Sequence, residues 1–109
     1  MAGTVSRGEV WMYEFSRPDK ERPVLVLTRD DAIPFLRTVM VAPIRSAIRG
    51  LPSEVVVGVV DGLKKDSAIT LDHVQTVERS LLRRYVTTLK ADRMRAVCRA
   101  LAVAAGCDS

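Results

Sequence analysis

Residues 22–44 read RPVLVLTRDDAIPFLRTVMVAPI, and this stretch decides the fold class. Val, Leu and Ile dominate the two runs 23–29 and 38–44, and such residues favour β-strands. The segment DDAIPFL between them contains Asp and Pro, which are typical of turns. The stretch therefore predicts two β-strands separated by a short loop.

Runs of the same kind lie on both sides of this stretch. GEVWMYEF (8–15), SEVVVGVV (53–60), SAITLDHVQTVE (67–78) and RRYVTTL (83–89) are predicted as further strands, and ERSLL (78–82) as one short helical turn. Strict alternation of strands with helices, as in a doubly wound α/β protein, is missing, as is a glycine-rich phosphate loop. The pattern predicts a small antiparallel sheet or partly open barrel.

The last segment changes its hydrophobic period from that of a strand to that of a helix. The following residues are spaced to share one face of an amphipathic helix: Met94, Val97, Cys98, Leu101, Ala102 and Ala105. Gly106 is a natural helix stop. The fold class is therefore mainly β with helices (α+β), a barrel closed by a C-terminal amphipathic helix, and Cys98 is expected to be buried in its apolar face.

Size and composition limit the possibilities further. The chain has 109 residues and a mass of 12.0 kDa, so residues 1–109 are predicted to form a single domain. A core this small would gain burial from a homodimer. No run approaches the ~20 apolar residues of a membrane span, and the N-terminal residues lack the apolar stretch of a signal peptide. We expect a cytoplasmic protein with no membrane contact and with free thiols at Cys98 and Cys107.

Positive charge is concentrated near the C-terminus. Residues 79–99 contain seven basic residues and one acidic residue, whereas the rest of the chain contains ten basic and twelve acidic residues. Clustered Lys and Arg attract phosphates at long range, which favours a nucleic-acid ligand. An acidic protein tail would be attracted equally well, and a solvated helix face is the third interpretation.

The residues exclude several kinds of chemistry. His73 is the only histidine, so catalysis by two histidines and the common zinc clusters with histidine are excluded. The aspartates lie beside predicted turns, where they favour local backbone hydrogen bonds, and they form no two-metal pattern. We expect no catalytic metal and no cofactor.

Two local groups of residues remain as a candidate site. Arg22 precedes the buried run 23–29, and Pro23, which lacks a backbone N–H, is expected to hold this corner at a strand rim. Arg45, Ser46 and Arg49 lie in the loop that leaves the run 38–44. Loops at strand ends could place the two groups over one cleft.

At these residues the sequence resembles the MazF/PemK (Kid) toxin family of toxin–antitoxin systems. The resemblance rests on the order and spacing of RGEVW (7–11), RPVLVLTRD (22–30), VAPI (41–44), LPSEVVV (51–57), DSAITLDHVQTV (66–77) and the final amphipathic helix. It implies a homodimeric barrel related to SH3 and CcdB barrels. It also implies a metal-independent, sequence-selective endoribonuclease acting on single-stranded messenger, ribosomal or transfer RNA. A cognate antitoxin with an extended acidic tail would occupy the RNA groove.

The resemblance also implies roles for particular residues. Arg22 corresponds to the catalytic arginine of the family, which cleaves RNA by attack of a ribose 2′-hydroxyl to leave 2′,3′-cyclic phosphate and 5′-hydroxyl ends. The catalytic threonine of the family falls on Arg45, so Ser46, the next hydroxyl, and Arg45 are the candidates for its role. The predicted RNA-binding residues lie in loops and at strand edges beside the motif 66–77: Arg49, Lys64, Lys65, Ser67, Asp72, His73 and Gln75.

Several alternatives stay open on the sequence alone. Arg22 could form a structural ion pair with Glu21 or Glu9. The alternating aromatic residues Trp11, Tyr13 and Phe15 favour a core or dimer interface over base stacking. For the whole protein, the alternatives are a non-catalytic barrel that binds RNA or antitoxin and a CcdB-like toxin that binds gyrase.

Overall fold

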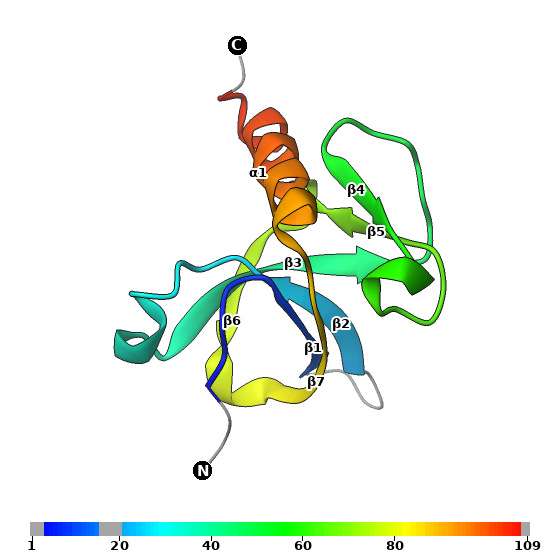
Figure 1. Ribbon diagram of the computed structural model, residues 1–109. Helices are drawn as coiled ribbons and strands as arrows, with labels where there is room; N and C mark the ends of the chain where they lie inside the picture. The colour runs from blue at the N-terminus through cyan, green and yellow to red at the C-terminus, as the bar shows by residue number, and fades with distance from the viewer. Residues whose placement is uncertain (1–3, 16–20, 108–109) are drawn as a thin grey trace.

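The strands form one antiparallel sheet that curls into a barrel (Figure 1). The computed structural model describes residues 4–15 and 21–107. The strands are β1 (Glu9–Glu14), β2 (Glu21–Val26), β3 (Thr38–Arg45), β4 (Glu54–Val57), β5 (Ser67–Thr70), β6 (Gln75–Glu78) and β7 (Leu82–Thr88). Short 3-10 turns η1 (Ile33–Phe35), η2 (Val59–Asp61), η3 (Leu71–His73) and η4 (Arg79–Leu81) connect them, and the helix α1 (Ala91–Ala105) follows. The predicted fold class is confirmed.

The longest strand, β3, connects the two halves of the sheet. The strand order is β4-β5-β3-β2-β1-β7, and β6 pairs with β3 outside this path. Residues 38–41 of β3 pair with β6, whereas Ile44 and Arg45 pair with β5, and β2 runs along the other edge. Because β3 changes partner between Val41 and Ile44, the middle of β3 lies where β2, the start of β6 and β5 come together.

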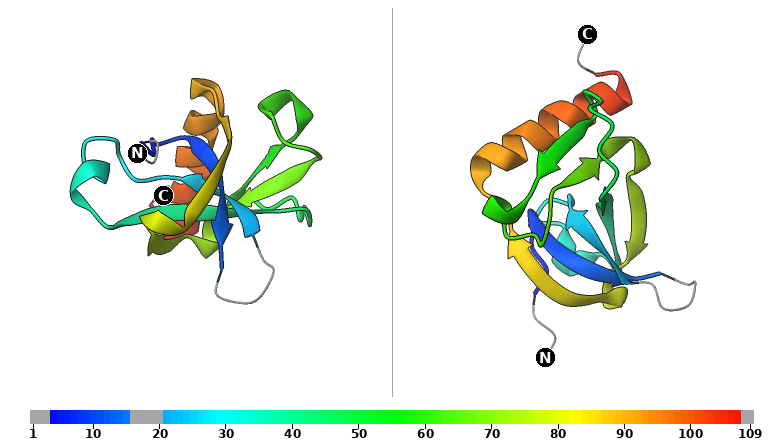
Figure 2. Two further views of the ribbon diagram at one scale, coloured as in Figure 1. Left: turned by 90° about the horizontal axis from the view of Figure 1, so that it is seen from below. Right: turned by 90° about the vertical axis from the view of Figure 1, so that its right-hand side faces the viewer.

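The second half of β2, Val24 to Val26, is buried on both faces, which explains its unbroken apolar sequence. Val24 and Val26 belong to the core inside the barrel, together with Tyr13 and Val41, and Trp11 and Phe15 pack against that core. Leu25 points to the opposite core, beneath α1. Figure 2 shows α1 lying alongside β4. The prediction that the aromatic residues of β1 contribute to a core is confirmed.

Two predicted strands are shorter or divided in the structure. The run 53–60 ends as a strand at Val57, and η2 then leaves Val59 and Val60 exposed. The run 67–78 divides into β5, η3 and β6, because its two halves pair with different ends of β3. The predicted turn at 78–82 is confirmed as η4.

The core-facing side of the helix is shifted from the predicted one: Met94 and Val97 of the predicted face are buried and Leu101 packs against the core, but Cys98 does not belong to this face. The buried residues of the helix are Met94, Val97 and Ala100, whereas Cys98 is exposed, so the prediction of a buried Cys98 is wrong. Each helical residue is turned by about 100° from its neighbour, and the stripe centred on Val97 leaves Cys98 beside Arg7. The Arg7 guanidinium lies 3.1 Å from the Cys98 sulfur. The helix ends before Gly106, as predicted. No helix in the described part of the chain is long and apolar enough to cross a membrane.

An ion pair joins η2 to α1. Arg93 Nε donates to Asp61 Oδ1 at 2.8 Å, and the Gly58 amide donates to Asp61 Oδ2 at 2.9 Å. Burial acts to raise the pKa of the Asp61 carboxyl, but the hydrogen bonds from Arg93 and Gly58 outweigh it and lower the pKa below its ordinary value. The same pair raises the pKa of Arg93.

Replacing Asp61 by asparagine is therefore expected to lower the free energy of unfolding at neutral pH by ~1–3 kcal/mol. Because the folded-state pKa lies below the unfolded one, this stabilisation is present above the unfolded pKa and is lost as the pH falls through the folded pKa. Urea unfolding from neutral to acidic pH should show a flatter acid limb for Asp61→Asn. Asp31→Asn, which removes a pair with Arg29 between largely exposed side chains, is the control. Equal slopes for Asp61→Asn and the wild type would contradict the prediction.

Candidate functional site

An open hollow of about 760 Å³ lies where the start of β2 meets the C-terminal end of β3. We call it the Arg22 hollow. Its lining residues are Phe15, Glu21, Arg22, Pro23, Pro43, Ile44, Arg45, Ser46, Ala47, Lys65, Ser67 and Gln75. Six of the ten predicted catalytic and RNA-binding residues therefore lie in one place: Arg22, Arg45, Ser46, Lys65, Ser67 and Gln75.

Strand register explains why two distant loops meet here. Val24 of β2 pairs with Pro43 of β3, so Arg22 at the start of β2 lies beside Arg45 and Ser46 at the end of β3. Strand β2 begins at Glu21, two residues before Pro23. Both arginines and Ser46 are exposed, so they are accessible to a ligand in the hollow.

The other side of the hollow comes from β5, β6 and the loop before them. Ser67 is buried, and its hydroxyl donates to the Lys65 carbonyl oxygen at 3.2 Å. This bond ties the first residue of β5 to the segment that carries Lys65. Gln75 at the start of β6 adds an amide that can both donate and accept hydrogen bonds.

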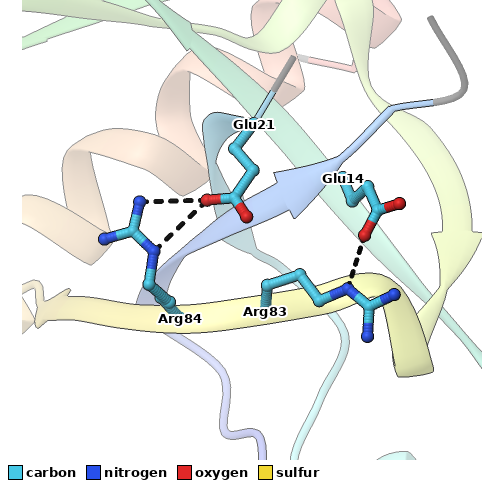
Figure 3. Close-up of polar contacts among 4 residues, drawn as sticks. All are labelled: Glu14, Glu21, Arg83 and Arg84. Carbon is cyan, nitrogen blue, oxygen red and sulfur yellow. Dashed lines mark hydrogen bonds and ion pairs between the residues drawn. The ribbon is translucent and has the colours of Figure 1, made fainter. Parts of the chain in front are cut away.

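The hollow is electropositive. Arg22, Arg45 and Lys65 line it together with one carboxylate, Glu21. Glu21 is engaged by Arg84, whose Nη2 and Nε lie 2.9 and 3.2 Å from its Oε1 (Figure 3). The charge of the hollow is therefore suited to an anion such as a phosphate.

Neither of the alternative ion pairs for Arg22 forms among the described residues. Glu21 pairs with Arg84, and Glu9 Oε1 accepts hydrogen bonds from the Ser6 amide and from Trp11 Nε1, each at 2.9 Å. The structure therefore gives Arg22 neither of the structural roles considered from the sequence.

Two arginines of β7 form ion pairs with the end of β1 and with the start of β2. Arg83 Nε donates to Glu14 Oε1 at 2.7 Å at the end of β1, and Arg84 pairs with Glu21 at the start of β2 (Figure 3). Sequence reasoning had counted these arginines only within the basic segment 79–99. Acidic residues at both ends of a strand connection, matched by two adjacent arginines, were the signal that could have identified the pairs.

Four predicted RNA-binding residues do not line the Arg22 hollow. Arg49 lies in the exposed loop after β3, where its amide donates to Glu54 Oε1 at 3.1 Å, and Lys64 is exposed next to Lys65. Asp72 accepts a hydrogen bond from the Ser53 hydroxyl, and His73 is exposed in η3. Both residues belong to η3, whereas Gln75 is the first residue of β6.

Sequence reasoning also missed the apolar wall of the hollow. Pro43, Ile44 and Ala47 line it, and Phe15, for which the sequence favours a core or dimer interface over base stacking, adds an aromatic ring. The alternation of β3 could not identify this wall, because it depends on the register between β2 and β3. No group of three or more His, Cys, Asp or Glu that could hold a metal ion occurs within residues 4–15 and 21–107.

Comparison with known proteins identifies the family. A family model described as "PemK-like, MazF-like toxin of type II toxin-antitoxin system" matches residues 6–105. The "Probable endoribonuclease MazF5" of Mycobacterium tuberculosis is 45% identical over 109 residues, which cover 99% of each chain. The solved structure of the Mycobacterium tuberculosis toxin MazF-mt6 superposes with a TM-score of 0.84 and 37% identity, covering 93% of this chain and 99% of that one.

A second solved structure supports the fold alone. It is titled an endoribonuclease in complex with its cognate antitoxin from mycobacterial species, and it superposes with a TM-score of 0.83 at 21% identity, covering 94% of this chain and 96% of that one. The fold is thus that of the compact antiparallel toxin barrels. The chain belongs to the PemK/MazF toxin family of type II toxin–antitoxin systems, as its motifs predicted.

Proposed function

We propose that this protein is an endoribonuclease, the toxin of a type II toxin–antitoxin pair, and that it cleaves single-stranded RNA in the Arg22 hollow. The observation that carries the proposal is the convergence of Arg22, Arg45, Ser46 and Lys65 on one open hollow. The endoribonuclease name of a relative that is 45% identical over nearly the whole chain supports it.

The proposed reaction needs no cofactor. The ribose 2′-oxygen attacks the adjacent phosphorus and forms the 2′-O–P bond, and the bond from phosphorus to the 5′-oxygen breaks. The 2′-hydroxyl proton passes to solvent, and the departing 5′-oxygen takes up a proton. The products are a 2′,3′-cyclic phosphate and a 5′-hydroxyl.

The residues of the hollow stabilise the charge that develops in this reaction. Arg22 donates hydrogen bonds to the non-bridging phosphate oxygens, where negative charge grows in the transition state. The Ser46 hydroxyl holds the scissile phosphate, and Arg45 is a second cation at the family's threonine position. An arginine stays protonated, so Arg22 acts by electrostatics rather than as a general acid or base.

The rim of the hollow offers contacts to the bases of an unpaired strand. The Phe15 ring can stack on a base, and the Gln75 amide can bond a base edge that is exposed only in single-stranded RNA. Lys65 adds a cation for a flanking phosphate. Arg49, Lys64, Asp72 and His73 remain predicted RNA contacts only outside the hollow.

The same cations explain how an antitoxin would inhibit. An extended acidic segment would place carboxylates on Arg22, Arg45 and Lys65 and exclude RNA from the hollow. The homodimer, the cytoplasmic location and the single domain over residues 1–109 also remain predictions.

End-group analysis of a long RNA of mixed sequence, incubated with the purified protein in EDTA, tests the proposal. We expect discrete breaks in primer extension, with 5′-hydroxyl ends that a polynucleotide kinase labels without prior phosphatase treatment. Intact RNA that is nevertheless bound would favour the non-catalytic barrel, for which Arg45 at the threonine position is the specific argument. RNA that is neither cleaved nor bound would favour the alternative in which the toxin binds a protein target such as gyrase.

A further inference from the structure

A second hollow, of about 800 Å³, lies between the N-terminal segment, β1, η4 and β7. It shares none of its described lining residues with the Arg22 hollow. We call it the Tyr85 hollow, and its characteristic residues are Trp11, Arg37, Glu78, Arg79, Arg83 and Tyr85. Nothing in the proposed cleavage reaction uses it.

Its aromatic side is already ordered. Trp11 pairs with Tyr85 across β1 and β7, and their rings meet edge to face, 6.1 Å apart at 77°. The Tyr85 hydroxyl lies 2.7 Å from Thr88 Oγ1, and Trp11 Nε1 donates to Glu9 Oε1 at 2.9 Å. The polar atoms of both rings are thus satisfied within the protein, while Tyr85 keeps 53% of its surface exposed. An exposed ring in a fixed orientation offers a face on which a planar group can stack.

The arginines beside these rings are also held in place. Arg79 Nη1 donates to the Ile33 carbonyl oxygen at 2.7 Å, and the Arg79 amide donates to the Arg37 carbonyl oxygen at 2.9 Å, so η4 is bonded to η1 and to the residue before β3. Arg83 donates through Nε to Glu14 and turns the rest of its guanidinium away from β1 (Figure 3). A guanidinium has five N–H donors, so most donors remain for a ligand.

The Tyr85 hollow carries a net positive charge. Arg37, Arg79 and Arg83 line it with Glu78 as the one carboxylate of the described lining. Within residues 4–15 and 21–107, no carboxylate lies within 4.0 Å of the Arg37 or Arg79 guanidinium. An exposed aromatic face beside guanidinium groups is the combination that binds nucleotides of an unpaired strand, with a base on the ring and phosphates on the arginines.

We propose that the Tyr85 hollow binds single-stranded RNA at nucleotides outside the cleavage site, with a base stacked on Tyr85 and a phosphate held by Arg37 and Arg79. The proposal rests on the proposed function in taking RNA as the ligand. An acidic peptide would also be attracted by the arginines, but its carboxylates would not require the Tyr85 ring. The ring therefore favours RNA. Arg84, which lies between Arg83 and Tyr85 in β7, pairs with Glu21 of the Arg22 hollow, so the proposal places one RNA strand along β7 from one hollow to the other.

Fluorescence anisotropy with two RNAs of different length tests this site. Both RNAs contain the cleavage sequence found by end-group analysis, with a 2′-deoxy sugar at the cleaved position, and they have about 6 and about 16 nucleotides, within the range of site sizes known for small barrels. Tyr85→Ala should weaken binding of the long RNA about 10-fold, as expected for one lost stacking contact, and leave the short RNA unaffected. The plot of log affinity against log salt concentration has a negative slope. Arg37→Ala should make this slope shallower by ~0.7 for the long RNA only, because one phosphate contact is lost.

The controls separate stacking from general damage. Tyr85→Phe keeps the ring and should bind the long RNA as the wild type does. Phe35→Ala removes another exposed aromatic side chain, outside both hollows, and should change neither affinity. Unchanged affinity of Tyr85→Ala and Arg37→Ala for the long RNA would overturn the proposal, as would an equal loss for both RNAs. A glutamate-rich peptide is measured in the same assay. If the variants lose affinity for this peptide and not for the long RNA, the proposal is also overturned.

Cleavage of the unmodified short RNA in EDTA distinguishes this proposal from the proposed function. Tyr85→Ala should cut the short RNA as fast as the wild type, because in the proposal the Tyr85 hollow binds nucleotides that the short RNA lacks. If end-group analysis finds no cleavage, the two RNAs are taken from the same mixed-sequence RNA at the same two lengths. A loss of affinity of Tyr85→Ala for the long RNA alone would then still support the second site, although the cleavage reaction is refuted.

Discussion

Replacing Arg22 by alanine is expected to slow single-turnover RNA cleavage by about 10²–10³-fold, the usual effect of removing one preorganised donor to a transition-state oxyanion. Arg22 lies exposed at the rim of the Arg22 hollow, so its side chain can be removed without opening the core. The melting temperature of the variant should stay close to that of the wild type. Quenched cleavage time courses at saturating protein measure the chemical step directly.

Two further variants make the Arg22 result specific. Arg22→Lys keeps the charge but loses the forked hydrogen bonds, so it should recover only part of the lost rate. Arg29→Ala removes another exposed arginine, which lines neither hollow and is not a predicted RNA contact, and should cleave at the wild-type rate. Wild-type cleavage by Arg22→Ala would exclude the Arg22 hollow as the cleavage site. If Arg22→Ala raised KM and left kcat unchanged, Arg22 would be a binding residue rather than a catalytic one.

The sequence predicted the parts of the fold in which a single local pattern decides the outcome. The run VLVL (24–27), which ends one residue after β2, is buried. Its side chains belong to two different cores, so every position is apolar. Arg22 could be identified for the same reason, because Pro23 and this run place it at a strand rim. Its proximity to Arg45 then follows from antiparallel pairing of β2 with β3.

Features that depend on tertiary contacts could not be predicted in the same way. The spacing of apolar residues in α1 allowed two adjacent stripes, and only packing against β4 and η3 selects the one that exposes Cys98. Asp72, His73 and Gln75 are near neighbours in sequence, but Asp72 and His73 belong to η3 and Gln75 to β6, and only Gln75 lines the Arg22 hollow. The Tyr85 hollow depends on the register of β1 with β7, which no local pattern encodes.

The largest expected effect on stability comes from a glycine that packs against β7. Gly62 ends η2 with a φ of +94°, and a Cβ at this position would overlap the Thr87 side chain, whose own Cβ would be 2.7 Å away. Thr87 is held there because its hydroxyl donates to the Asp61 carbonyl oxygen at 3.1 Å. Gly62→Ala therefore carries the cost of a left-handed backbone, ~1–2 kcal/mol, and an overpacking cost of another ~1–3 kcal/mol.

Gly50 provides the matched control, because its φ is +74° and a Cβ there would meet nothing within 4 Å. Gly50→Ala should lower the free energy of unfolding only by the cost of the left-handed backbone. In urea unfolding, Gly62→Ala should therefore lower it by ~1–3 kcal/mol more, which is the cost of overpacking. Combining Gly62→Ala with Thr87→Ala should restore only part of this difference, since the Cβ of residue 87 remains in contact. The prediction would be contradicted if both glycine variants lowered the free energy of unfolding equally. In that case η2 can move away from β7 at little cost.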